Sequence, residues 1–135
     1  MKRILFLLLS TTLLFSCDKD KDKDPAPELS AQVAGSYKVT KLEVDGQNVP
    51  LTNASIGIVL EKFSAEVVTG KMKVKVNGES EPDEDLGTLN LKNAGSTGID
   101  IYEGTEKVGN LDKSNKLTIF VVFEGQDYEM AAEKQ

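Results

Sequence analysis

Apolar and polar residues alternate over much of the chain beyond residue 35, with the two-residue period of a β-strand. In the segment 71–76, Met72, Val74 and Val76 share one face and three lysines share the other. Residues 29–34 could form one helical turn, but no helical period extends further. The pattern predicts eight strands, near residues 36–44, 56–63, 66–76, 87–92, 98–103, 106–111, 116–124 and 127–133.

Two of these strands depart from simple alternation. In the first strand, Tyr37 and Val39 share one parity and Leu42 shares the other, so we expect a bulge or bend near residues 40–41. The strand at 116–124 is apolar on both faces. We therefore expect part of its outer face to be covered or to contact a partner.

Eight antiparallel strands joined by short loops favour an all-β, up-and-down barrel, which removes exposed sheet edges. A two-sheet β-sandwich is the alternative. Such a barrel can enclose one small ligand or be filled by its own side chains. The short loops slightly favour a packed or narrow interior, whereas a ligand, if bound, would be lipid-like or otherwise hydrophobic. The candidate interior residues are Tyr37, Leu42, Val44, Met72, Val74, Leu89, Ile99, Ile101, Leu117, Ile119 and Val121.

The chain begins with a short basic segment and an apolar run that ends at its only cysteine. Lys2 and Arg3 precede apolar residues 4–15, which are too few to span a bilayer as a helix but typical of a secretory signal. The ending LFSC, residues 14–17, resembles the lipobox of bacterial lipoproteins. The resemblance implies cleavage before Cys17 and acylation of that residue, which would anchor the protein in a membrane.

The predicted organisation is a signal segment at 1–16, a charged tether at 17–28 and a barrel domain at 29–135. Alternating charges and two prolines should keep the tether extended and solvated. Its alternating aspartates resemble the first ligand positions of an EF-hand calcium loop, but the Gly and Glu that this loop requires are missing. Charges directly after the acylated cysteine also resemble the export signals of surface lipoproteins in Gram-negative bacteria. We expect an outer-membrane lipoprotein that faces the periplasm or the cell surface.

The composition removes several kinds of chemistry. The chain has no His, which excludes Ser–His and Cys–His nucleophiles and the usual zinc ligand. Without Lys2 and Arg3, the chain has 14 lysines and 22 acidic residues, which gives a net charge of −8. This negative charge opposes nucleic-acid binding. We predict a protein that is not an enzyme, with no catalytic or metal site and no cofactor.

The stretch GSYKVTKLEVDG at residues 35–46 resembles the start of the small lipocalin-like lipoproteins of the calycin class. In that class a Gly-x-Trp opens a bent first strand, and residues 35–37 fall on those places, with Tyr for Trp. The resemblance implies a lipocalin-like barrel over residues 33–135. The family's Arg that packs on the Trp has no counterpart, so Lys134 is the residue left to lie over Tyr37.

An acidic stretch between two predicted strands is a second candidate site. We expect a solvated loop near the lysines of the strand 66–76, able to pair with them weakly or to dock a basic partner. The candidate partner-binding residues are Glu79, Glu81, Asp83, Glu84 and Asp85.

Two functions remain from the sequence. The first is a membrane-anchored lipoprotein whose lipocalin-like barrel binds a small hydrophobic ligand. The alternative is a packed barrel that docks an envelope protein or a glycan, for example as an inhibitor-type module, through its surface or its acidic loop.

Overall fold

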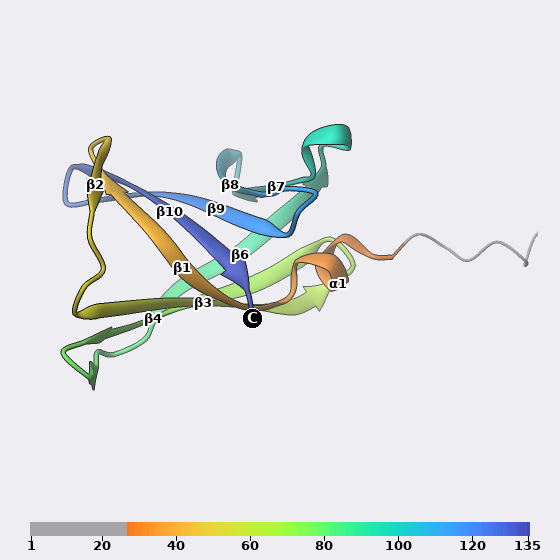
Figure 1. The fold of residues 1–135 in the computed structure, drawn as a ribbon. Coiled ribbons are helices and arrows are strands. Elements are labelled where there is room, and N and C mark those ends of the chain that lie inside the picture. Colours follow the sequence, from red (N-terminus) through yellow and green to blue (C-terminus); the bar gives the residue numbers. More distant parts are fainter. Residues whose placement is uncertain (1–26) are drawn as a thin grey trace, which may run out of the picture.

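The strand pattern is realised as ten β-strands and two short helices in a computed structural model that describes residues 27–135. The signal segment, Cys17 and nearly all of the tether lie outside the described residues. The elements in chain order (Figure 1) are α1 (Leu29–Val33), β1 (Gly35–Val44), β2 (Gln47–Val49), β3 (Ala54–Ser64), β4 (Val67–Val76), β5 (Glu79–Ser80), β6 (Glu84–Asn93), the 3₁₀ helix η2 (Gly95–Thr97), β7 (Ile99–Glu103), β8 (Glu106–Leu111), β9 (Lys116–Phe123) and β10 (Gln126–Lys134).

Eight of the strands form a closed antiparallel barrel. Neighbours in the barrel are neighbours in sequence, in the order β1-β3-β4-β6-β7-β8-β9-β10, and β10 pairs back to β1 to close the ring. The up-and-down barrel and its eight predicted strands are confirmed, and the β-sandwich alternative is wrong. The short strands β2 and β5 pair only with β1 and β4, respectively, and lie outside the closed ring.

The bulge expected in the first strand is present. Pairing of β1 with β10 shifts register between Val39 and Lys41. This shift lets Tyr37 and Val39 face the interior in one half of the barrel while Leu42 faces it in the other.

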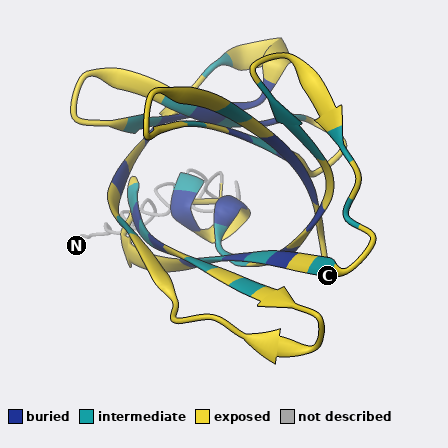
Figure 2. Ribbon diagram, turned by 90° about the vertical axis from the view of Figure 1, so that its left-hand side faces the viewer, coloured by how far each residue is buried: buried dark blue, intermediate teal, exposed yellow. Residues whose placement is uncertain are grey.

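The helix α1 closes one end of the barrel, where it is seen inside the ring of strands in Figure 2. Val33 of this helix is fully buried in the core. The Tyr37 hydroxyl donates a hydrogen bond to the Val33 carbonyl, and Lys134 Nζ donates one of 3.1 Å to the Gln32 carbonyl. Lys134 Nζ also lies 5.8 Å from the centroid of the Tyr37 ring, which is the contact expected from the sequence.

The acidic stretch is more ordered than predicted. We expected a solvated loop up to a strand near residue 87, whereas β6 begins at Glu84 and residues 79–80 form β5. The reason is cross-strand pairing: Glu84 and Asp85 lie opposite Met72 and Lys71 of β4. The basic Lys71 opposes Asp85, and the apolar Met72 opposes Glu84, so only Asp85 has a cation as its direct cross-strand neighbour.

Candidate functional site

The half of the barrel farther from α1 contains a cavity of about 610 Å³. Figure 2 views the barrel from this end. Most of the side chains around the cavity are apolar or aromatic, which is typical of a site for a small molecule. The lining residues are Leu42, Ile56, Met72, Val74, Glu81, Pro82, Glu84, Asp85, Leu86, Leu89, Glu103, Val108, Ile119, Phe120, Val121, Phe123, Tyr128 and Met130.

About half of the predicted interior residues line the cavity. Those that line it are Leu42, Met72, Val74, Leu89, Ile119 and Val121. Those that are buried in the core and do not line the cavity are Tyr37, Ile99, Ile101 and Leu117. Val44 is half-buried near the end of β1 and is not a lining residue. The slight preference for a packed or narrow interior is therefore right only for the half around α1.

Several lining residues were not in the predicted set. Ile56 lies opposite Val74 in the β3–β4 ladder, so its inward direction follows once that register is known. Phe123, Tyr128 and Met130 were expected on the inner faces of their strands from the alternation, although they were not among the candidate ligand-binding residues, and the cavity lining confirms that direction. Leu86 was assigned to the acidic loop, where no alternation could be read.

The β7–β8 hairpin is short and leaves a lateral window in the barrel wall. β6 pairs with β7 only over residues 90–93, and β8 pairs with β9 only over residues 117–119. Residues 84–89 of β6 and 120–123 of β9 have no pairing strand within residues 27–135 on the edge that faces the β7–β8 hairpin. We call the space between these two edges the lateral window. In Figure 1 the β7–β8 hairpin stops well short of the turn that joins β9 to β10.

The window explains one residue that alternation alone would have placed outside. Phe120 has the outward parity of β9 and is 41 % exposed, yet it lines the cavity. The edge of β9 is open at this position, so the ring can reach round the strand to the cavity mouth. Val122, on the same face, is 68 % exposed, so the outer face of β9 is not covered within residues 27–135.

All of the charged side chains that line the cavity are acidic. Three of the five predicted loop residues, Glu81, Glu84 and Asp85, are among them, and Glu103 joins them from the end of β7. The other two do not line the cavity: Glu79 lies in β5, and Asp83 forms an ion pair of 3.1 Å with Lys73. This ion pair is the weak surface pairing expected for the loop.

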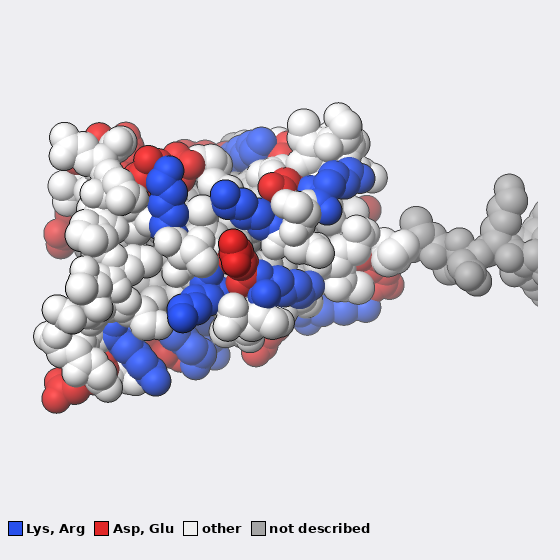
Figure 3. Space-filling model, viewed as in Figure 1, with Lys and Arg blue, Asp and Glu red and all other residues white. Residues whose placement is uncertain are grey.

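The lysines of β4 lie on the opposite side of the wall. Lys71, Lys73 and Lys75 alternate with the cavity residues Met72 and Val74 and are exposed, as predicted. Figure 3 shows lysine side chains spread over the outer surface of the barrel, with acidic side chains among them. The strand β4 is therefore basic on its outer face, whereas the charged residues that line the cavity are acidic.

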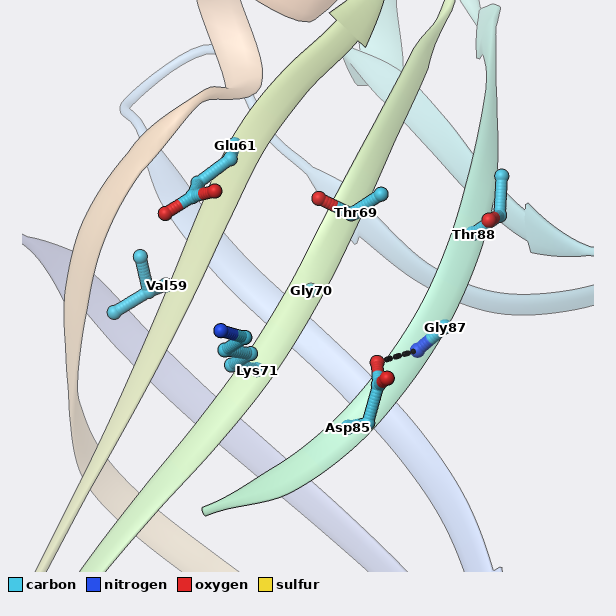
Figure 4. Close-up of a pocket in the computed structure, with 8 residues that line it drawn as sticks. All are labelled: Val59, Glu61, Thr69, Gly70, Lys71, Asp85, Gly87 and Thr88. Atoms are coloured by element: carbon cyan, nitrogen blue, oxygen red, sulfur yellow. Dashed lines mark hydrogen bonds between the residues drawn. The ribbon is translucent and has the colours of Figure 1, made fainter.

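A second, shallow pocket of about 160 Å³ lies on the outer surface, across β3, β4 and β6 (Figure 4). Gly70 and Gly87 lie opposite each other at its centre, next to the register shift between β4 and β6. Its charged groups are Glu61, Lys71 and Asp85, and Asp85 Oδ1 accepts a 2.8 Å hydrogen bond from Gly87 N–H. The pocket is about a quarter of the volume of the barrel cavity, and we assign it no function.

The ionisable groups with shifted pKa values lie away from the cavity. Burial raises the pKa of Tyr37 to about 12 in the packed half. Hydrogen bonds from Lys107 and Asn110 lower the pKa of Asp100, and those from Lys116 and Ser114 lower the pKa of Asp112. Each of these shifts is accounted for by packing or turn structure.

Comparison of the chain with protein-family models, with curated proteins and with solved structures finds no match. Among residues 27–135, no three His, Cys, Asp or Glu side chains come together as a metal site. In the same range, no helix is long and apolar enough to cross a membrane. The cavity is thus the feature of the described barrel on which a functional argument can be built.

Proposed function

We propose that this protein is a membrane-anchored lipoprotein whose barrel binds a small hydrophobic ligand. The observation that carries the proposal is the cavity of about 610 Å³, which lies within the range that small-molecule sites occupy. Its floor is made by the packed half of the barrel, with Leu89, Ile119 and Met130 belonging both to the core and to the cavity wall. A ligand would enter from the open end or through the lateral window.

The membrane part of the proposal rests on the sequence. The basic start, the short apolar run and the lipobox-like LFSC ending support acylation at Cys17. The charged tether that follows would hold the barrel clear of the lipid surface. An outer-membrane position facing the periplasm or the cell surface fits this arrangement, because a carrier anchored there could exchange hydrophobic molecules with the bilayer beside it.

Native mass spectrometry tests the binding function. The chain from Pro25 onward would be secreted in its own host and purified without detergent, which would otherwise compete for the cavity. We expect an added mass on the order of a few hundred daltons, the size that such a cavity holds. A bare polypeptide that also fails to bind added hydrophobic probes would contradict the proposal.

A pair of variants links the binding to the cavity. Val74→Phe places a larger side chain inside the cavity and should abolish the added mass. Val122→Phe makes the same chemical change on the outer face of β9, where the side chain is 68 % exposed, and should leave the added mass in place. Equal loss in both variants would show that the bound molecule does not occupy the cavity.

Docking of an envelope protein or glycan is the second candidate. The exposed Phe120, Val122 and Phe123 near the open edge of β9 favour it, since such clusters often mark contact surfaces. Docking through the acidic residues 79–85 should weaken with salt, whereas binding of a neutral hydrophobic ligand should depend little on salt.

A further inference from the structure

The distribution of charge around the cavity identifies the chemical class of its ligand. Glu81, Glu84 and Glu103 line the cavity together with apolar walls, and no lysine lines it. We infer that the ligand is a cationic amphiphile, with an apolar chain in the barrel and an ammonium group at the lateral window. This inference rests on the proposed function, because it assumes that the cavity binds a ligand.

The acidic side chains lie at the start of β6 and at the tip of the β7–β8 hairpin, whereas the β9 edge of the window, residues 120–123, is apolar. Glu84 lies opposite the cavity residue Met72 in the β4–β6 ladder, so the two side chains share the inner face of the wall. Glu103 ends β7, two residues after the fully buried Ile101, at the tip of the hairpin that stops beside the window. An ammonium group at the mouth of the cavity would therefore meet acidic side chains and no lysine of the cavity lining.

These carboxylates are not neutralised within the barrel. The ion pairs among residues 27–135 use other acidic groups, namely Glu28, Glu43, Asp83 and Asp100. Asp85 differs, because its carboxylate accepts the Gly87 N–H and lies opposite Lys71. The negative charge available to a ligand is therefore carried mainly by Glu81, Glu84 and Glu103.

The apolar part of the site lies directly below this rim. From the window the cavity continues past Leu86 and Val121 to Leu89, Ile119 and Met130 at its floor. A chain seated there would remove apolar surface from water, while the head group would stay close to the carboxylates. An anionic amphiphile such as a fatty acid would meet like charges at the rim, and the net charge of −8 on the chain without Lys2 and Arg3 acts in the same direction.

Four decyl compounds separate the head-group preference from hydrophobic binding. Decylamine, decyltrimethylammonium, decanol and decanoate would be titrated by calorimetry into the chain from Asp18 to Gln135, at neutral pH and low salt. We expect the two cations to bind about tenfold or more tightly than decanol, and decanoate to bind most weakly. The preference should shrink in high salt, because the carboxylates are at the surface.

A charge-neutral double variant assigns the preference to the window. Glu84→Gln with Glu103→Gln should reduce the cation preference, measured as the ratio of decylamine affinity to decanol affinity in the same protein, severalfold. Glu66→Gln with Glu133→Gln removes the same charge from exposed residues outside the cavity and should preserve the preference.

The outcomes distinguish this inference from the proposed function. If decanol and decanoate bind as tightly as the cations, or the window variant keeps the full preference, the cavity is a hydrophobic site and the inference on the head group is wrong. If none of the four compounds binds, the inference and the proposed function both fail.

Discussion

Lys134 lies over the ring of Tyr37, with Nζ 5.8 Å from the ring centroid, so the last strand of the barrel is tied to the first by a cation–π contact. The same two side chains hold the helix that closes this end: Tyr37 donates a hydrogen bond to Val33, and Lys134 donates one to Gln32. The elements β1, β10 and α1 therefore meet at one point. These contacts close the end of the barrel that lies below the cavity.

The hydroxyl of Tyr37 should stabilise the closed end measurably. Tyr37→Phe removes its hydrogen bond and leaves the Val33 carbonyl without that partner in a buried environment. We expect the free energy of unfolding to fall by about 1 kcal/mol at neutral pH, measured by chemical denaturation. An unchanged midpoint would show that the hydroxyl contributes nothing to holding the helix.

The same residue predicts a loss of stability in strong base. Burial raises the Tyr37 pKa from 10.0 to about 12 in the folded protein. Between these pH values the unfolded chain loses the Tyr37 proton and the folded chain keeps it, so the free energy of unfolding falls as pH rises. The decrease is on the order of 2 kcal/mol. Tyr37→Phe has no hydroxyl to titrate, so the difference in unfolding free energy between the two proteins should change between pH 10 and pH 12. A difference that stays constant over this pH range would contradict the prediction.

Gly98 cannot accept a side chain. Its φ is +107°, and a Cβ atom would collide with the backbone of Leu111 and Asp112 at the base of the β7–β8 hairpin. We expect Gly98→Ala to cost more than about 2 kcal/mol of unfolding free energy. Gly104→Ala is the matched control, because φ is +62° there but nothing lies within 4 Å of the added atom, and it should cost only about 1 kcal/mol. Similar decreases in melting temperature in both variants would show that the positive φ, and not the collision with Leu111 and Asp112, causes the loss of stability.

Ser30 should be replaceable with a gain in stability. Its side-chain oxygen is buried in α1 and has no hydrogen-bond partner among residues 27–135. Ser30→Ala removes a polar group that lost its water on folding, so the unfolding free energy should rise by up to about 1 kcal/mol. Ser36→Ala, on the exposed face of β1, should change stability by less than about 0.5 kcal/mol. A clear loss in Ser30→Ala would indicate that its hydroxyl is hydrogen-bonded in solution.

Acylation at Cys17 predicts a change of cellular fraction. In Cys17→Ser the acyl chains cannot attach, so the protein should move from the membrane fraction to the soluble or secreted fraction. The barrel should keep its thermal stability, because every contact described in it lies beyond residue 26. Mass spectrometry of the unsubstituted protein checks the acylation directly, and a Cys17 without added acyl mass would disprove the lipoprotein proposal without affecting the binding experiments.

The strands could be predicted from the sequence because their alternation records one buried face. Tyr37 and Leu42 even revealed the bulge between them, since a change of parity within one strand has few other causes. The short strand β2 and the first residues of β6 were missed for the opposite reason. Glu84 and Asp85 carry no apolar signal, and they are strand residues only because β4 offers them a matching edge.

The cavity could not be predicted, because an inward-facing residue looks the same in a core and in a pocket. Leu117 and Val121 lie on one face of one strand, yet Leu117 is fully buried and Val121 lines the cavity. The difference arises from α1, which fills one end of the barrel, and from the short β7–β8 hairpin, which leaves the other half incomplete. Both effects depend on tertiary contacts that no local pattern records.

The pairing of β1 with β10 also sets the order of events during folding. Tyr37 lies opposite Lys134, so the ladder that closes the ring joins residues from the two ends of the domain. Such distant contacts can form only after the whole domain has been synthesised, and barrels of this kind fold slowly for that reason. Until β10 arrives, β1 and β9 each present an unpaired edge to other chains. A chain that stops before β10 should therefore aggregate through these two edges.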